Sequence, residues 1–229
     1  MSESSKTIVI SLGGSLVVPD SVNADFLKLF KSLVEKKIGE GYRFLVIVGG
    51  GKIARRYQEA LAIVRNDVGQ NDLDWMGIYT TQFNAQLVRL MFKDLAHELI
   101  VGDPYDVADI NDSLIIGAGA VPGSSTDLGA VRAAENLGAK IVINLSNVDH
   151  VYDADPRKNP NAQKFDVLSW SQYRSFIPVE WQPGLSTPFD PIASKKAQEL
   201  DIVVVIMNGD LKNLENYLDH KEFNGTTIS

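Results

Sequence analysis

The stretch Val46–Lys52 constrains the fold of this chain more than any other, because an apolar, β-branched run stops there at three glycines and an amphipathic segment follows. Residues 44–48 have the composition of a buried strand. After the glycines, apolar residues recur at the spacing of one helix face, at Ile53, Tyr57, Ala60, Leu61 and Val64. The pattern predicts a strand, a tight turn and a helix.

Successive glycines let a backbone turn sharply and present bare N–H groups at a helix N-terminus, where the helix dipole favours an anion. Lys52, Arg55 and Arg56 lie in the first turns of this helix. Cations at that end are disfavoured by a few tenths to about 1 kcal/mol each, and a bound anion would reverse this penalty. We interpret the stretch as a seat for a phosphate or carboxylate; the alternative is a glycine turn with solvated basic residues.

Strands and helices alternate along the rest of the chain. The expected strands are residues 7–12, 44–48, 98–101, 113–116, 140–145, 202–207 and, as an edge strand, 226–228. The expected helices are residues 26–38, 53–64, a stretch holding Leu87, Leu90, Met91 and Leu95, then 128–137, 169–176, a helix capped by Asp190 with Pro191 at its first position, and 211–218. Residues 66–74 are expected to be a polar loop and residues 157–191 largely irregular. The pattern predicts an α/β fold, a three-layer sandwich with a mostly parallel central sheet flanked by helices, in a single domain of 229 residues.

Ligands of such sheets collect beyond the carboxyl ends of the strands. Four polar or glycine-rich loops follow predicted strands and are expected to meet on that rim: Gly13–Ser15, Gly49–Lys52, Gly117–Asp127 and Ser146–Asp155. In the third loop, residues 124–127 are all good N-caps for the next helix.

Composition narrows the chemistry. The chain has no cysteine, which excludes disulfides, thiolate metal sites and cysteine nucleophiles, and its net charge of −7 argues against a generic nucleic-acid or membrane surface. Its three histidines are too scattered for a metal motif. The N-terminus does not read as a signal peptide, and no apolar run approaches the ~18 residues of a membrane span, so a cytoplasmic protein is expected.

The glycine loops match none of the common nucleotide or hydrolase motifs. Lys52 follows three glycines but does not complete a Walker sequence, no dinucleotide-binding pattern follows the first strand, and no nucleophile elbow occurs. A rim with several anion seats, basic residues and carboxylates suits phosphoryl transfer between small molecules, which requires positioning, Mg²⁺ and positive charge.

Five segments carry a family resemblance: Ile10–Leu16, Val48–Arg55, Asn147–Pro156, Phe189–Lys195 and Asn224–Ile228. In this order they resemble the amino acid kinase superfamily over almost the whole chain, and within it most closely the archaeal type of uridylate (UMP) kinases. The block N-V-D-x-V-Y-x-A-D-P is the most specific of them.

The resemblance implies transfer of the γ-phosphoryl group of ATP to UMP, with Mg²⁺ held through the ATP phosphates and a homo-oligomer, typically a hexamer. It divides the chain into an acceptor half, about 1–135, and an ATP half, about 136–229. The residues it assigns to ATP are Gly14, Ser15, Gly51, Arg55, Ser146, Asn147, Tyr152 and Asp155. Those it assigns to UMP are Gly50, Asp74, Ala120, Val121, Pro122, Gly123, Ser124, Ser125 and Thr126. The catalytic candidates are Lys195, Arg55, Asp190 and Lys52.

Several of these residues also have plain structural interpretations. Asp190 can be an N-cap alone, Lys195 a solvated helix residue, and Tyr152 a ring packed on the sheet. Asn147 and Asp149 can build the turn through hydrogen bonds to the backbone.

The sequence departs from the family pattern at two places. Ser11 stands where many members have a lysine that neutralises charge on the moving phosphoryl group. Ala120 and Val121 stand where Thr-His is expected, followed by Ser124 and Ser125. These departures leave two alternatives open: a kinase of this fold with another small acceptor, or a non-catalytic protein that stores a nucleotide or oxyanion. An oligomer interface could lie on residues 26–38 or 87–95.

Overall fold

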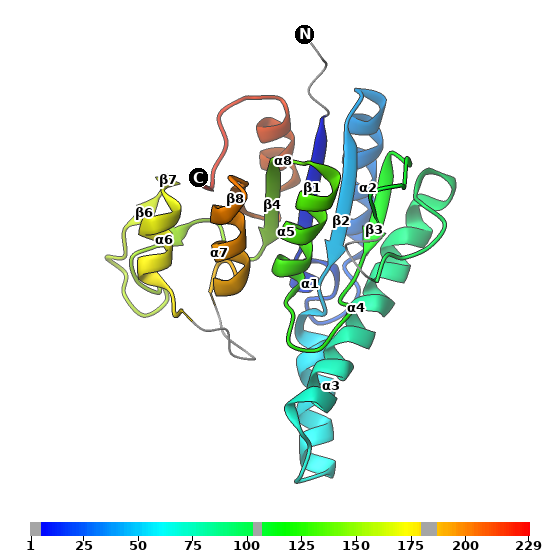
Figure 1. Ribbon diagram of the computed structural model, residues 1–229, viewed down its shortest axis with the longest axis vertical. Coiled ribbons are helices and arrows are strands. Elements are labelled where there is room, and N and C mark those ends of the chain that lie inside the picture. The colour runs from blue at the N-terminus through cyan, green and yellow to red at the C-terminus, as the bar shows by residue number, and fades with distance from the viewer. Residues whose placement is uncertain (1–5, 103–106, 180–186) are drawn as a thin grey trace.

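The computed structural model describes residues 6–102, 107–179 and 187–229 (Figure 1). A seven-stranded sheet forms its centre, with strand order β3-β2-β1-β4-β8-β9-β7. The strands are β1 (Thr7–Leu12), β2 (Arg43–Val48), β3 (Leu114–Gly117), β4 (Ile141–Ser146), β5 (Val151–Tyr152), β6 (Lys164–Phe165), β7 (Val167–Leu168), β8 (Val203–Asn208) and β9 (Thr226–Ile228). Every strand pair in the sheet is parallel except β8 with β9, and β5 and β6 form a separate antiparallel pair.

Helices cover both faces of the sheet (Figure 1). They are α1 (Gly14–Val17), α2 (Ala24–Gly39), α3 (Gly51–Val64), α4 (Gln70–Phe92), α5 (Thr126–Leu137), α6 (Trp170–Phe176), α7 (Pro191–Glu199) and α8 (Leu211–Leu218), with a 3-10 turn at Lys93–Leu95. The predicted three-layer α/β sandwich is confirmed.

Successive side chains of β1 point to opposite faces of the sheet, and helices cover both faces. Ile8 and Ile10 pack into one apolar cluster with α2, α4 and α8, whereas Val9 between them packs into a second cluster with α5, α6 and α7. All six residues of β1 are buried. A strand buried on both faces is expected to be apolar at most positions, which is the pattern seen in a parallel sheet.

The predicted strand at residues 98–101 is wrong. The segment pairs with β3 at one isolated bridge, Val101 with Gly117, and a second bridge, Ala96 with Leu114, lies just before it. Two separated contacts hold the segment against the edge of the sheet without forming a continuous ladder.

Two other predictions need correction. The polar loop expected at 66–74 is shorter, because α4 begins at Gln70 and the polar residues that follow lie in its exposed first turns. Strand β9 is not an edge strand, since the two-residue strand β7 pairs with it on the outside. Part of the segment expected to be irregular, residues 180–186, lies outside the described residues.

Helix α3 and the first half of α4 extend beyond the carboxyl edge of the sheet as a helical pair (Figure 1). The helix predicted after the glycines is confirmed, but its apolar residues are largely exposed: Tyr57 is 54%, Ile63 80% and Val64 85% accessible. The two helices therefore form an arm beside the rim and not part of the core.

Candidate active site

The four predicted loops meet at the carboxyl ends of β1 to β4. Leu12, the last residue of β1, is in register with Val48 on β2 and Leu145 on β4, and Ile47 is in register with Gly117 on β3. Because these strands are parallel and adjacent, the loops that follow them share one rim.

Two glycine turns touch each other at the centre of this rim. A Cβ on Gly14 would lie 2.3 Å from the backbone nitrogen of Gly51 and 2.4 Å from the carbonyl oxygen of Gly49. Gly51 has a φ of +68°, in the left-handed region that side chains disfavour. The backbones meet where Ser15 and the first turn of α3 begin, so only glycine fits at this contact.

The three cations of α3 are not equivalent. Lys52 Nζ lies 3.3 Å and Arg56 Nη2 3.1 Å from the Asp20 carboxylate. Arg55 is exposed and forms no ion pair with any of the described residues. Arg55 is thus the cation of this turn that can bind an anion without losing a protein partner, whereas Lys52 must share its charge with Asp20.

A carboxylate, Asp127, lies at the end of β1. Its Oδ1 accepts a hydrogen bond from Ser11 Oγ at 2.8 Å and another from Asn144 Nδ2 at 3.0 Å, and its Oδ2 accepts one from the backbone N–H of Asp190 at 3.2 Å. Burial raises the pKa of Asp127 to about 6, and the neighbouring Asp190 adds to the rise, while the hydrogen bond from Ser11 opposes it. Asp127 therefore takes up a proton at a higher pH than an ordinary aspartate.

Sequence reasoning missed Asp127, which it treated only as one of several N-cap candidates. The N-cap of α5 is Ser125, whose Oγ accepts from the backbone N–H of Leu128 at 3.1 Å. The available signal was a pair of polar residues in otherwise apolar strands. Ser11 and Asn144 are in register on β1 and β4 and both are buried, so they need a shared partner.

Asp190 is the N-cap of α7, as predicted, because its Oδ1 accepts from the backbone N–H of Ala193 at 2.7 Å. It is only 5% exposed, and burial raises its pKa. Lys195, on the same helix, has a side chain 63% exposed and lies 3.9 Å from Glu199. Lys196 pairs with Glu135 on α5 at 2.7 Å. The roles of Asp190 and Lys195 in chemistry stay predictions.

The loop between β3 and α5 is fixed to α4. Asp74 Oδ2 accepts from the backbone N–H of Gly123 at 2.8 Å, and Thr81 Oγ1 accepts from that of Gly119 at 2.8 Å. Gly50 packs on the same helix, because a Cβ there would lie 3.6 Å from Gly77 O. Asp74, Gly50 and the loop are therefore neighbours. They come from different parts of the chain and are expected to bind one ligand.

Beside this loop is a cavity of about 200 Å³, which we name the loop cavity. Its lining comes from the ends of β2 and β3, the loop, and α5: Ile47, Ala118, Gly119, Ala120, Val121, Ser124, Ser125, Thr126, Gly129 and Arg132. Five of the seven loop residues predicted as a binding site line it, while Pro122 and Gly123 do not.

A larger cavity of about 830 Å³, the hairpin cavity, follows β4 and includes Asn147, Tyr152 and Asp155 in its lining. Tyr152 donates its hydroxyl to Asp149 at 3.1 Å, and hydrogen bonds from Arg157 to Asp155 hold the pKa of that carboxyl below its usual range. Ser146 lies at the end of β4, where its Oγ accepts from the backbone N–H of Val148 at 3.2 Å. Three of the four residues predicted for this pocket line it; Ser146 does not.

Similar proteins support the resemblance read from the sequence. A model of the amino acid kinase family matches residues 6–208. The uridylate kinase of Thermococcus sibiricus is 35% identical over 208 residues, 89% of this chain and 90% of that protein. That of Methanocorpusculum labreanum is 33% identical over 228 residues, 96% of this chain and 94% of that protein.

Solved structures share the fold. The crystal structure of uridylate kinase from Archaeoglobus fulgidus has a TM-score of 0.82 and 28% identity, covering 97% of this chain and 99% of that one. A UMP kinase from Bacillus anthracis has a TM-score of 0.78 at 18% identity, covering 98% and 96% of the two chains, and shows the shared fold alone.

Proposed function

The chain belongs to the amino acid kinase family, and from this premise we propose that it is a uridylate kinase, transferring the γ-phosphoryl group of ATP to UMP with release of UDP and ADP. Relatives named uridylate kinase match 82–97% of the chain at 32–37% identity. The activity of those relatives supports the same reaction here.

The observation that carries the proposal is the arrangement of two cavities around the end of β1. In the sheet, β1 lies between β2 and β4. The loop cavity lies at the ends of β2 and β3, and the hairpin cavity follows β4. An acceptor in the first and a nucleotide in the second would meet over the glycine turns and Asp127, which is the geometry that a direct transfer between two bound molecules requires.

On the nucleotide side, we assign the adenosine to Asn147, Tyr152 and Asp155 in the hairpin cavity, with Ser146 at its entrance. The phosphates then extend to the glycine turns at Gly14, Ser15 and Gly51, whose N–H groups bind anions. Arg55 binds the same phosphates with its guanidinium, whose donors match phosphate oxygens.

On the acceptor side, we assign UMP to Gly50, Asp74 and residues 120–126. Asp74 fixes the loop through Gly123 and keeps its second oxygen on Gln70, so its carboxylate positions the loop as well as facing the ligand. The hydroxyls of Ser125 and Thr126 lie at the start of α5, where the helix dipole favours the phosphate of the acceptor.

Phosphoryl transfer of this kind uses Mg²⁺, which neutralises charge on the β- and γ-phosphates. Mg²⁺ takes one or two protein carboxylates together with phosphate oxygens and water. Asp127 and Asp190 supply two neighbouring carboxylates, since the backbone N–H of Asp190 donates to Asp127, and two carboxylates are a donor set that would fit the ion. The described residues contain no group of three acidic or histidine side chains that could hold the metal alone, which leaves the remaining positions to the phosphates.

The positive charge that stabilises the transferring phosphoryl group must come from residues other than Ser11. Ser11 uses its hydroxyl to bind Asp127 and carries no charge. We assign the stabilisation of the transition state to Arg55, with Lys52 and Lys195 as further cations whose long side chains can turn toward the rim. Residues of about 1–135 then bind mainly the acceptor, and those of about 136–229 mainly ATP.

The proposed enzyme is a homo-oligomer, with a hexamer as the expected form. Residues 26–38 do not offer an apolar face, because Phe26, Phe30 and Leu33 are buried in the core. Helix α4 offers such a face: Tyr79, Phe83, Leu87 and Leu90 follow one another at helical spacing and are 61%, 79%, 36% and 57% exposed.

Among the described residues, none of the helices has the length and apolar character that a membrane span requires. A cytoplasmic location stays a prediction.

A coupled assay of ADP release from Mg-ATP tests the function against a panel of acceptors: UMP, CMP, AMP, dTMP, acetylglutamate, carbamate and isopentenyl phosphate. Turnover selective for UMP is the expected result. Selectivity for another acceptor would keep the kinase fold but overturn the assignment at Asp74 and residues 120–126. ATP binding without turnover on any acceptor would favour the storage alternative.

A further inference from the structure

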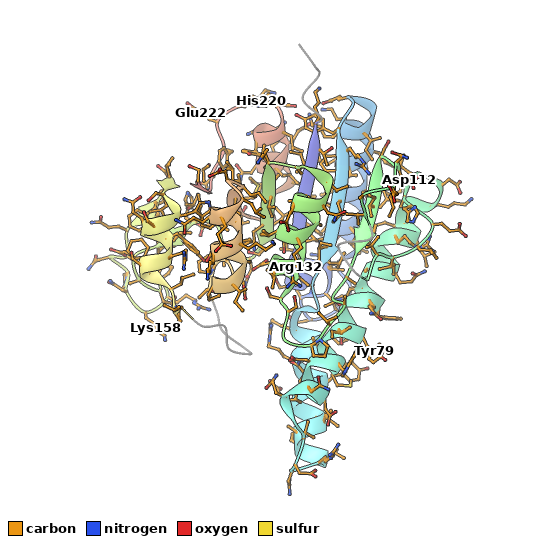
Figure 2. All side chains as sticks on the ribbon, in the orientation of Figure 1. Tyr79, Asp112, Arg132, Lys158, His220 and Glu222 are labelled. Atoms are coloured by element: carbon orange, nitrogen blue, oxygen red, sulfur yellow. The ribbon has the colours of Figure 1, made fainter. Side chains whose placement is uncertain are left out.

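The loop cavity contains a cation that the family motifs do not include. Arg132 lies on α5 and lines the cavity together with Ala120 and Val121. Figure 2 shows Arg132 on the part of α5 that lies toward the carboxyl edge of the sheet. Among the residues that line this cavity, Arg132 is the one with a charged side chain.

The position of Arg132 along α5 sets its distance from the phosphate end of the cavity. Ser125 caps the helix and Thr126 is its first residue, so an acceptor phosphate is expected there. Arg132 follows Thr126 by six residues, which is about 9 Å along a helix. Because both residues line the loop cavity, a nucleoside monophosphate with its phosphate at Thr126 can extend its base toward Arg132.

The rest of the lining leaves the base with few side-chain partners. Ala120 and Val121 have apolar side chains, Gly119 and Gly129 have none, and Ile47 closes the cavity from β2. Such a lining can hold an aromatic ring by shape, but only a polar group can distinguish one ring from another.

Arginine distinguishes pyrimidines by its hydrogen-bonding character. Its guanidinium has five N–H donors and no acceptor. Uracil presents a carbonyl oxygen at the position where cytosine presents an amino group. Arg132 can donate to the carbonyl, whereas the amino group would place donor against donor and leave both unpaired.

We propose that Arg132 binds the O4 carbonyl oxygen of the acceptor base, at the position of the amino group of cytosine, and thereby selects uracil over cytosine. This inference rests on the proposed function and assigns to α5 the base recognition that the apolar pair Ala120-Val121 does not supply. It makes Arg132 a specificity-determining residue for the acceptor, with no role toward ATP.

The test is steady-state kinetics of the full chain with Mg-ATP and either UMP or CMP. Arg132→Leu is expected to lower kcat/KM for UMP roughly 10- to 100-fold, mainly through KM, because it removes hydrogen bonds from a charged donor. With CMP the change is expected to be at most a few-fold, so the preference for UMP falls by about the same factor. The KM for ATP should stay within about twofold.

Arg132→Gln is a second variant with a similar shape and a polar end. Its amide has an acceptor oxygen as well as a donor, so kcat/KM for CMP is expected to exceed that of Arg132→Leu. Glu135→Gln is the matched control, because it removes a charge from the same helix at a residue that pairs with Lys196 and does not line the cavity. Thermal unfolding of each variant verifies that the fold is retained.

The outcomes separate this inference from the proposed function. If the wild-type chain turns over UMP and both Arg132 variants keep its UMP-to-CMP preference, the role of Arg132 is wrong and the uridylate kinase assignment stands. If the wild-type chain does not turn over UMP at all, the proposed function fails, and this inference fails with it.

Discussion

Ser11 on β1 donates its hydroxyl to Asp127, 116 residues further along the chain, at 2.8 Å. This contact occupies the place where many relatives of this fold are expected to have a lysine. Burial raises the pKa of Asp127 to about 6, and the hydrogen bond from the neutral Ser11 hydroxyl opposes this rise only in part. The electrostatics of the rim consequently depend on pH in the range where enzymes of this kind are assayed.

The first prediction concerns stability. The pKa of Asp127 is about 6 in the folded chain, against an ordinary value of 3.8, so the native state binds more protons than the unfolded state between these values. The free energy of unfolding therefore falls as pH rises through this window and levels off above it. Asp127→Asn does not titrate, and its stability relative to wild type should rise by up to about 3 kcal/mol between pH 4 and 7.5.

Urea denaturation at the two pH values measures this difference. Glu98→Gln, an exposed glutamate outside the site, is the control and should follow the wild type at both. If Asp127→Asn also follows the wild type, with a constant offset, then Asp127 titrates normally and the pKa assignment is wrong.

The glycine contact gives the second prediction. Gly14→Ala places a Cβ 2.3 Å from the backbone of Gly51, where neither turn can yield without moving the anion-binding N–H groups. We expect a loss of about 3 kcal/mol or more in stability, and at least roughly 100-fold in kcat/KM in whatever protein remains folded. Chemical denaturation and the coupled assay measure the two effects.

Gly39→Ala is the matched control for this change. A Cβ on Gly39, at the end of α2, would meet no atom within 4 Å. The variant should keep wild-type activity and gain up to about 1 kcal/mol, since alanine restricts the unfolded chain. Equal behaviour of the two variants would show that the contact at Gly14 does not matter.

The third prediction separates two neighbouring arginines. Arg55 forms no ion pair with the described residues, while Arg56 pairs with Asp20. If Arg55 stabilises the charge on the transferring group, Arg55→Ala should lower kcat by about 100- to 1000-fold. Arg56→Ala should change kcat only a few-fold, because an exposed ion pair contributes little. Single-turnover kinetics with Mg-ATP and UMP compare them, and comparable losses in both variants would contradict a specific role for Arg55.

Much of the fold and rim could be predicted from local sequence patterns. Strands buried on both faces are largely continuous apolar runs, and runs of glycine mark the turns at Gly14 and Gly51. Asp127 could not be found this way, because its partners Ser11 and Asn144 lie on two other elements and meet only when β1 and β4 pair. Arg132 was missed for a similar reason: a polar residue on a helix is ordinary until the packing of α5 places it beside a cavity.

The apolar stripe on α4 gives the last prediction. Phe83 is 79% exposed, and with Tyr79, Leu87 and Leu90 it forms a continuous apolar surface on one helix. A patch of this kind on a folded chain is typical of an interaction surface, and we expect it to bind another copy of this chain. Phe83→Glu should shift the mass measured by light scattering from an oligomer toward a monomer, because burying an unpaired carboxylate at the interface is strongly unfavourable. Leu29→Glu changes a leucine on α2 that is 62% exposed and should leave the mass unchanged. Dissociation by Leu29→Glu and not by Phe83→Glu would place the interface on α2. A monomeric wild type would show that neither helix forms an interface with another copy.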